Sequence, residues 1–311
     1  MDLRQLRALL AVAEHQNFSA AARALHTVQS NISTHVSRLE HEMGVVLIDR
    51  ATNTLTEEGR VVADRARRIE AEFSALESDV AALRDEIRGR VRIGVIGTTA
   101  RWIVPPLLGA LSEQHPAISL LVLDATTSSL VPQLVAGQID LAVVNTPISE
   151  PDVTVQPLFD EELLVVAPVG HPLAGREQVS LAELAAYPLL LEAPGTSFRE
   201  DIDAQAAAVG VELQAQAEFD GMRLLASLAF TGFGAAILPA SAAPTPPFGV
   251  DAAWTKTPIS GVTRRSVGLA RRRRGLPSAA ERAVVEVLID VIDNEAPLEA
   301  GIEPARPSTS R

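Results

Sequence analysis

The feature that most constrains this sequence is a long run of apolar residues spaced alternately four and three positions apart. The run comprises Val62, Ala66, Ile69, Phe73, Leu76, Val80, Leu83 and Ile87. A lone surface helix drifts toward a period of about 3.6, whereas a sustained period of 3.5 keeps the seam of a left-handed helix pair closed. We therefore predict a helix through which two copies of the chain pair. Packing of this helix on its own chain is the alternative, and the many charged residues at the other positions disfavour it.

The residues before this helix show the spacing of three shorter helices and a small hairpin. Residues 3–14 carry an apolar stripe, and Ser19 can cap a short helix over residues 20–25. A third stripe runs from Ile32 to Met43 and ends at Gly44, a common residue just past a helix. Residues 45–48, the turn at 51–54 and residues 55–56 then predict a short hairpin. Three helices with a tight turn before the third are a helix-turn-helix arrangement, and the hairpin would be its wing.

After Gly89 the pattern changes to alternating strands and helices. Strands are predicted at 91–96, 118–123 and 141–144, with helices at 100–114 and 128–136 between them. Such repeats indicate a parallel sheet. The alternation of strands and helices continues in a second lobe, with elements predicted at 162–168, 188–191, 200–209, 214–219, 223–231 and 235–238. A strand at 264–270 and a helix at 279–292 follow. From residue 295 the composition turns to Pro, Glu and Ser, which predicts a disordered tail over 295–311.

The charge is distributed unevenly along the chain. The whole sequence carries −12, but residues 1–90 hold twelve Arg, no Lys and fourteen acidic residues, a net charge of −2, which leaves −10 for the other 221. A strongly acidic protein is an unusual partner for nucleic acid. The near-neutral first part therefore indicates that the two parts meet different partners.

Cysteine is absent from all 311 residues, which excludes disulfides, thiolate metal sites and cysteine nucleophiles. The first residues lack the apolar core of a signal peptide, and no stretch approaches the roughly 18 uninterrupted apolar residues of a membrane span. We expect a cytoplasmic protein without a membrane segment.

Several motifs together carry a family resemblance over nearly the whole chain. They are His26–Glu40 with the sequence HTVQSNISTHVSRLE, Glu42–Gly44, Leu55–Gly59, Pro105–Leu107, Gly137–Ala142 and Gly232–Pro239. With these motifs the sequence resembles the LysR-type transcriptional regulators. The resemblance implies an α/β multidomain protein with an N-terminal winged helix-turn-helix, a long linker helix that dimerises, and a C-terminal two-lobed α/β effector domain like the type 2 periplasmic binding proteins.

The resemblance divides the chain into domains at approximate positions. Residues 1–59 would form the DNA-binding domain and 60–89 the linker helix. Residues 90–294 would form the effector domain, with lobe I at 90–160 plus 265–294 and lobe II at 161–264. Such a protein is expected to be a homodimer, or a homotetramer, on double-stranded DNA, and its two-fold symmetry predicts a pseudo-palindromic promoter site.

The residues expected to contact DNA gather at the start of the third helix, because the N-terminal end of a recognition helix reaches base edges in the major groove. Gln29 and Thr34 project opposite the apolar stripe, so we favour DNA contact for them, whereas a capping role is equally open for Ser30. Arg38 would bind phosphate or pair with Glu42. The full predicted set is Ser19, Gln29, Ser30, Asn31, Ser33, Thr34, His35, Arg38, Arg50 and Thr52.

Two departures from the family pattern reduce the positive charge of the predicted DNA-binding domain. Position 34 often carries Arg in these proteins and is Thr here, and the wing between Arg50 and Leu55 lacks the usual extra Arg residues. Each phosphate contact contributes about 0.9 to the salt slope of DNA binding. We therefore expect weaker non-specific binding and a shallower salt dependence than a basic winged domain would show.

Three predicted helix starts are rich in hydroxyl groups, and helix N-termini bind anions through free N–H groups. Capping is the better explanation of each start alone, but the three together favour a cleft for a small, possibly acidic effector. The family resemblance supports effector contact for Thr98, Thr127, Thr196 and Ser197, and the predicted set is Thr98, Thr99, Thr127, Ser128, Asn145, Thr196, Ser197 and Phe198. Arg101, Arg199 and Arg223 could add charge, although solvated positions are favoured for them.

Other chemistries find little support in the sequence. The run Arg271–Arg274 is interpreted as a solvated turn, and Gly232-Phe-Gly234 lacks the third glycine of a dinucleotide site. His115 and His171 lack neighbouring ligands at metal-binding spacing. We expect no metal, no cofactor and no catalytic residue. An α/β enzyme with an appended helix-turn-helix, acting on a small acid, is the alternative hypothesis.

Overall fold

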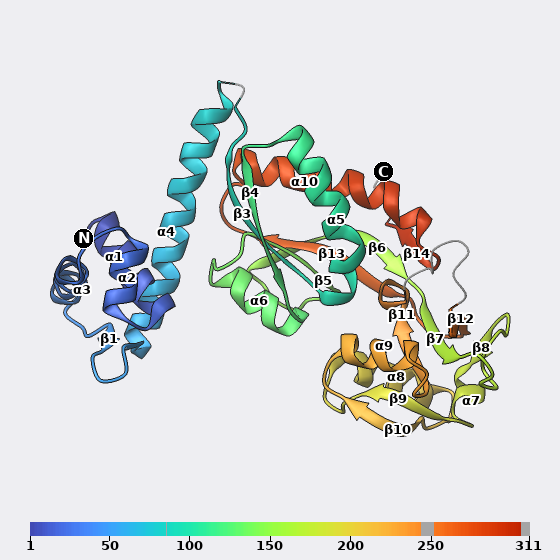
Figure 1. Cartoon of the computed structure of the whole chain (residues 1–311). Coiled ribbons are helices and arrows are strands. Elements are labelled where there is room, and N and C mark those ends of the chain that lie inside the picture. The colour runs from blue at the N-terminus through green and yellow to red at the C-terminus, as the bar shows by residue number, and fades with distance from the viewer. Residues whose placement is uncertain (85, 244–251, 306–311) are drawn as a thin grey trace.

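Three parts follow one another along the chain in the computed structural model, which describes residues 1–84, 86–243 and 252–305. A cluster of short helices at the N-terminus leads into one long helix, and two α/β lobes follow it (Figure 1). The predicted succession of a helix-turn-helix, a linker helix and a two-lobed α/β region is confirmed.

The N-terminal part contains α1 (Leu3–His15), α2 (Phe18–Ala24), α3 (Gln29–Met43), β1 (Ile48–Asp49) and β2 (Thr54–Leu55). Ile32, Val36 and Leu39 of the predicted α3 stripe are buried, whereas Met43 is 45% exposed, and Gly44 ends that helix at φ +70°. The helix α2 starts earlier than predicted, because Asn17 caps it by accepting from Ala20 N, so that Ser19 lies within the helix. The first wing strand is shorter than predicted, since Val45 and Val46 remain exposed and lie outside it.

The long helix α4 (Glu57–Ala82) begins where the sequence indicates, because Thr56 Oγ1 accepts a hydrogen bond from Gly59 N at 2.9 Å. It ends earlier than the apolar spacing predicts. The backbone N–H groups of Arg84 and Glu86 both donate to the Ala81 carbonyl, which turns the chain out of the helix. Ile87 therefore lies outside α4.

Lobe I is built on a six-stranded sheet in the order β14-β6-β13-β5-β3-β4. The predicted parallel arrangement holds for β3 with β4 and β5 only, because β13, β6 and β14 run antiparallel. The strands are β3 (Gly89–Val95), β4 (Ile118–Asp124), β5 (Leu141–Asn145), β6 (Val153–Glu161), β13 (Arg265–Arg272) and β14 (Ile302–Pro304).

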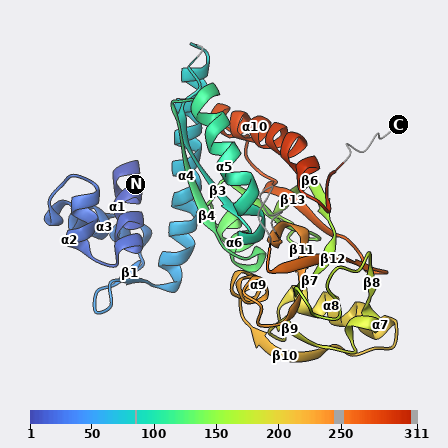
Figure 2. The ribbon, with the colours of Figure 1, turned by 45° about the vertical axis from the view of Figure 1, so that its right-hand side comes forward.

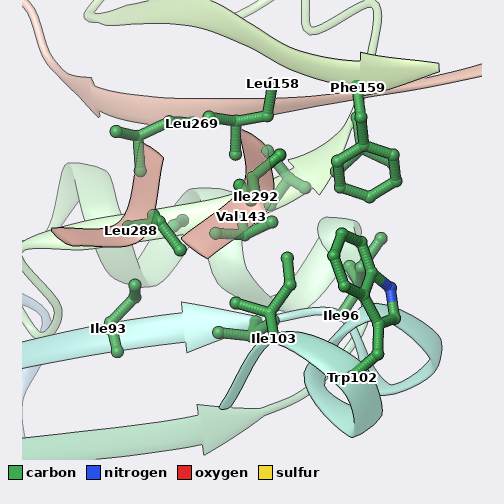
Figure 3. Packing of buried hydrophobic residues seen from close by; sticks show 14 of the residues in the cluster. Ile93, Ile96, Trp102, Ile103, Val143, Leu158, Phe159, Leu269, Leu288 and Ile292 are labelled. Carbon is green, nitrogen blue, oxygen red and sulfur yellow. The ribbon is translucent and has the colours of Figure 1, made fainter. Parts of the chain in front are cut away.

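Three helices cover this sheet: α5 (Gly97–Gln114), α6 (Thr127–Val135) and α10 (Ala279–Glu295). The helices α5 and α10 lie together over one face, and α6 lies on the other (Figures 1 and 2). Figure 3 shows the core between them, where the ring of Trp102 meets that of Phe159 edge to face at 5.2 Å. Aromatic pairs of this geometry pack more favourably than their buried area alone accounts for.

Lobe II holds the second six-stranded sheet, in the order β10-β9-β11-β7-β12-β8. Its strands are β7 (Leu163–Pro168), β8 (Val179–Ser180), β9 (Pro188–Glu192), β10 (Gln214–Phe219), β11 (Ala235–Pro239) and β12 (Trp254–Ser260). Its helices are α7 (Leu181–Leu184), α8 (Ser197–Ala208), α9 (Met222–Phe230) and the 3-10 turn η1 (Ala240–Ala242).

The chain crosses between the lobes at two neighbouring places. It leaves lobe I where β6 ends at Glu161 and β7 begins at Leu163, and it returns between β12 and β13. The predicted disordered tail is wrong for residues 295–304, because Glu295 is the last residue of α10 and the following residues include the 3-10 turn η2 (Ala296–Leu298) and β14. Ala296 and Ile302 are buried in lobe I, so their burial orders this segment. Residues 306–311 lie outside the described part.

Candidate functional site

The start of α3 presents polar side chains on the surface opposite its buried stripe. Gln29, Ser30, Asn31 and Thr34 are exposed, whereas Ser33 and His35 are half-buried on the flank. Val28 is the N-cap and makes no side-chain capping bond, so Ser30 is not the capping residue. The first-turn N–H groups of a helix without a side-chain cap are free to bind phosphate oxygens.

Hydrogen bonds hold several of these side chains in place. Ser19 Oγ donates to Gln29 Oε1 at 3.4 Å, and Thr34 Oγ1 donates to the Ser30 carbonyl at 2.8 Å. Asn31 Nδ2 donates to Thr27 Oγ1 at 3.0 Å. The structure thus gathers Ser19 and the first turns of α3 on one surface.

Arg50 holds the wing against α3. Its guanidinium donates to Ser37 Oγ at 3.2 Å and to Glu40 Oε2 at 2.9 Å, and it lies 4.8 Å from the centre of the Phe18 ring. Glu40 Oε1 accepts from the backbone N–H groups of Leu47 and Ile48. Glu40 is a residue that the sequence analysis missed, because only the folded hairpin brings these groups together.

The remaining predicted DNA contacts lie at the edges of the same surface. Thr52 lies at the tip of the wing, with its hydroxyl 2.7 Å from that of Thr54. Arg38 is exposed, and its alternative partner Glu42 accepts instead from Gln5 Nε2 and from the N-terminal amine.

The predicted pairing stripe of α4 is exposed over most of its length. Ile69, Phe73, Leu76, Val80 and Leu83 are between 40% and 87% exposed, whereas Ala66 packs into the N-terminal core. Five large apolar side chains in one row on a helix indicate a partner surface, because such a patch is costly in water. Within this stripe, only Val62 and Ala66 pack into the N-terminal core, among the residues that the structure describes.

The opposite side of α4 attaches to lobe I. Asp79 Oδ1 accepts from Ala279 N at 2.8 Å and Ser78 Oγ from Ala280 N at 3.2 Å, so α4 caps the start of α10. Arg68 Nη2 donates to the Val135 carbonyl at the end of α6, at 2.7 Å. Gly137, at φ +75°, allows this approach, since a Cβ there would lie 3.4 Å from Arg68 Cγ. The helix α4, which follows the helix-turn-helix domain, is therefore hydrogen-bonded to lobe I.

A buried ion pair marks the crossing between the lobes. Arg265 Nε donates to Glu161 Oε1 at 2.7 Å, and the Glu161 side chain is fully buried. Arg265 Nη2 also donates to Thr98 Oγ1 at 3.1 Å and to Ser241 Oγ at 3.3 Å. Sequence reasoning missed Arg265 and Glu161, because a single charged residue at a strand end gives no local signal.

The other predicted effector residues of lobe I meet at the carboxyl ends of its parallel strands. Thr127 Oγ1 accepts from Asn145 N at 3.0 Å, and Ser128 Oγ lies 3.0 Å from Thr126 Oγ1. Thr99 Oγ1 and Asn145 Oδ1 are buried and have no hydrogen-bond partner within the described part of the chain. Unpartnered buried polar atoms are costly and indicate a place for water or a ligand group.

The lobe II residues mainly serve the start of α8. Thr196 caps it by accepting from Arg199 N at 3.3 Å, Ser197 is its first residue, and Phe198 packs against the lobe II core. Burial raises the pKa of nearby Glu192, against the hydrogen bond from Thr196 and the charge of Arg265. The structure therefore shows the capping role for this third helix start.

A cavity of about 560 Å³ lies between the lobes, and its walls come from α5, β4, α9 and η1. Of the predicted effector residues only Thr98 lines it. Two charged residues of the cavity lining, Arg101 and Arg223, were named in the sequence analysis, where solvated positions were favoured for both. Both are exposed, as expected, and Arg223, whose side chain is 73% exposed, also pairs with Asp124 across the lobes at 2.5 Å.

Two family models match the chain and together span most of it. The model described as "Bacterial regulatory helix-turn-helix protein, lysR family" matches residues 3–60, and "LysR substrate binding domain" matches residues 84–293. The chain belongs to the LysR family. This confirms the resemblance found in the sequence.

Individual LysR-family relatives align over nearly the full length. A "Probable hydrogen peroxide-inducible genes activator" of Mycobacterium leprae (strain TN) is 33% identical over 302 residues, 93% of this chain and 94% of that protein. A full-length OxyR of Pseudomonas aeruginosa, with one cysteine replaced by aspartate, has a TM-score of 0.78 at 25% identity and 99% coverage of both chains. CbnR in complex with its target DNA has a TM-score of 0.67 at 25% identity and covers 95% of this chain and 100% of its own.

Two interpretations of charged residues in this LysR-family protein were wrong. Arg199 is not solvated: its side chain is 12% exposed and donates to Asp203 and Glu218. Arg271 and Arg272 belong to β13 rather than to a turn, and Arg272 donates to the Ile139 carbonyl at 2.8 Å. Arg199 and Arg272 both serve the packing of their lobes.

Metal-ligating side chains do not cluster in the described ranges. Among the helices that the structure describes, none is long and apolar enough to cross a membrane.

Proposed function

We propose that this LysR-type transcriptional regulator binds promoter DNA with the exposed start of α3 and changes its binding when a small molecule occupies the space between its lobes. The single observation that carries the DNA-reading part is the exposed polar surface of α3, which bears no capping side chain at its start. Amide and hydroxyl side chains at the start of a recognition helix can read base edges and bind phosphates. The relative CbnR was solved with its target DNA, which supports this use of the fold.

A homodimer follows from the exposed stripe of α4, and pairing through it would place two α3 helices on one duplex. Two-fold symmetry then favours a pseudo-palindromic site with half-sites about one helical turn apart. A tetramer, as two such dimers, is part of the proposal. Because its target is chromosomal DNA, we place the protein in the cytoplasm and assign it no catalytic step.

The signal is proposed to be a bound ligand rather than thiol oxidation. The M. leprae relative is named as a probable activator of hydrogen peroxide-inducible genes, and the P. aeruginosa OxyR was solved with a cysteine replaced. None of the 311 residues here is Cys, so the chain has no thiol that peroxide could convert to a sulfenic acid or disulfide. A non-covalent effector can still shift the balance between two lobe arrangements, provided it binds one of them more tightly.

Fluorescence anisotropy with labelled DNA from the region upstream of the gene tests the reading surface. Gln29→Ala and Thr34→Ala are each expected to weaken binding about 5- to 150-fold, since one good base contact contributes about 1–3 kcal/mol. Gln133→Ala, which removes a half-buried amide of α6 that donates to the Ser129 carbonyl far from α3 in the chain, is the matched control and should change nothing. Unchanged binding and selectivity in both α3 variants would overturn the assignment.

A further inference from the structure

We infer that the cavity between α5 and α9 binds a small singly charged anion with an apolar body, such as an aromatic or medium-chain carboxylate. This inference rests on the proposed function, because it names the ligand class for the space between the lobes. Three features of the cavity carry it: its apolar walls, its excess of one positive charge, and its position across both lobes.

The walls are apolar on several sides. Val104 and Pro105 of α5 and Val122 of β4 come from lobe I, and Met222, Ala226 and Phe230 of α9 come from lobe II. The volume of about 560 Å³ lies within the range of roughly 300–1,000 Å³ that is typical of small-molecule sites. An apolar body of one or two rings would fill such a space and gain free energy by leaving water.

The charged residues on the lining leave one positive charge in excess. Arg101 and Arg223 are cationic and Asp124 is anionic. Arg223 is paired with Asp124, whereas Arg101 Nη2 donates to a neutral acceptor, the Ser241 carbonyl, at 3.1 Å. The nearby residues Lys256 and Glu299 carry opposite charges and offset each other. A ligand with one negative charge therefore matches the lining.

Backbone groups add to this attraction. The helices α5 and α9 start at Gly97 and Met222, both on the cavity lining, and neither has a side-chain cap. Uncapped first-turn N–H groups favour anions. Gly97 also leaves room for the ion pair that joins the lobes, because a Cβ there would lie 2.8 Å from Asp124 Oδ1.

A ligand in this cavity would change the relative stability of different lobe arrangements. Arg223 belongs to lobe II and Asp124 to lobe I, so an anion that binds Arg223 competes with a contact between the lobes. Arg101 meanwhile joins α5 to η1 at the lobe crossing. A ligand held by both arginines would favour one arrangement of the lobes over another.

The test uses two fluorescent probes that differ in charge. 8-Anilinonaphthalene-1-sulfonate is an apolar monoanion, and N-phenyl-1-naphthylamine is its uncharged relative. The full-length protein is expected to bind one sulfonate probe per chain and to bind it more tightly than the neutral probe. Trp254 stacks on Phe230 of the cavity wall at 4.7 Å, so energy transfer from tryptophan reports binding at this place.

Four variants, each checked by circular dichroism, separate the charge from the volume. Arg101→Gln should weaken the sulfonate probe roughly tenfold and leave the neutral probe within twofold, and Asp124→Asn should tighten the sulfonate probe by a similar factor. Ser227→Phe should exclude both probes by filling the cavity. Arg176→Gln, an exposed arginine of lobe II that pairs with Glu183, is the matched control and should change neither.

The outcomes decide between the inference and the proposed function. Equal affinity for both probes, or no effect of Arg101→Gln and Ser227→Phe, would overturn the inference. The inference would also be overturned if monomers bound the probe and dimers did not, because a second copy of the chain would then fill the cavity. Binding of the upstream DNA is measured on the same samples; its absence in the unmodified protein would refute the proposed function while leaving the probe result intact.

Discussion

Replacement of Arg265 by Met should lower the free energy of unfolding of the effector domain by more than the loss of a surface ion pair does. Methionine keeps much of the length of the arginine side chain but removes its charge and its donors. The carboxylate of Glu161, which is fully buried, then keeps the hydrogen bond from Ser241 N at 2.7 Å as its one remaining side-chain bond within the described part of the chain. Thr98 Oγ1 and Ser241 Oγ lose the donor that they share.

The expected loss follows from the burial of Glu161. Removing one partner of a buried ion pair costs about 3–5 kcal/mol, because the remaining charge stays out of water without compensation. The second substitution Glu161→Gln removes that charge, so the double variant should regain about 1–3 kcal/mol relative to Arg265→Met alone. This rescue separates the effect of a buried charge from the mere loss of packing.

Urea unfolding followed by tryptophan fluorescence measures these differences, since Trp102 lies in lobe I and Trp254 in lobe II. Arg176→Met is the control: it removes an exposed pair with Glu183 and should cost less than about 1 kcal/mol. A loss below 1 kcal/mol for Arg265→Met, or a double variant no more stable than the single one, would refute the reasoning.

Three further predictions concern pairing, pH and peroxide. Leu76→Asp places a charge on the exposed stripe of α4 and should convert dimers to folded monomers in light scattering, whereas Glu77→Gln beside it should not; persistent dimers would contradict the pairing surface. Burial, with the charge of Asp140, raises the pKa of Glu281 to about 7, so the folded state holds a proton that the unfolded state releases above pH 4.5. The free energy of unfolding should therefore fall as pH rises from about 4.5 through 7. The Glu281→Gln variant should be more stable than the parent by roughly 3 kcal/mol at pH 8 and equal to it near pH 4.5. Equal stability of the two proteins at both pH values would exclude the raised pKa of Glu281. Hydrogen peroxide should leave the affinity for upstream DNA within twofold, and a peroxide effect that a thiol reductant reverses would be incompatible with a chain that lacks Cys.

Local patterns predicted the helical parts of this protein well. The buried stripe of α3, the glycine that ends it and the threonine that caps α4 are all properties of residues within one or two turns. The same holds for the exposed seam of α4, whose period of 3.5 is visible without any knowledge of its neighbours. Errors at this level were small and local, such as Asn17 rather than Ser19 at the start of α2.

Distant contacts were beyond such reasoning. The segment after residue 295 has the composition of a loose tail, yet Ile302 fills lobe I and β14 pairs with β6. The hydroxyl-rich helix starts were correctly seen as helix starts, but their capping roles and their distances from the cavity depend on how two sheets face each other. Of the eight predicted effector residues, Thr98 alone reaches the cavity lining.

The sequence by itself determined the family of this protein, the buried face of α3, the exposed stripe of α4 and the lack of any cysteine thiol, because periodicity, capping and residue identity act over short range. Only the tertiary structure decided which residues line the cavity between the lobes. Arg265 and Glu161 are 104 positions apart, and Arg223 and Asp124 are 99 apart. No local pattern marks such pairs, since it is the double crossing of the chain between two sheets that brings their charges into contact.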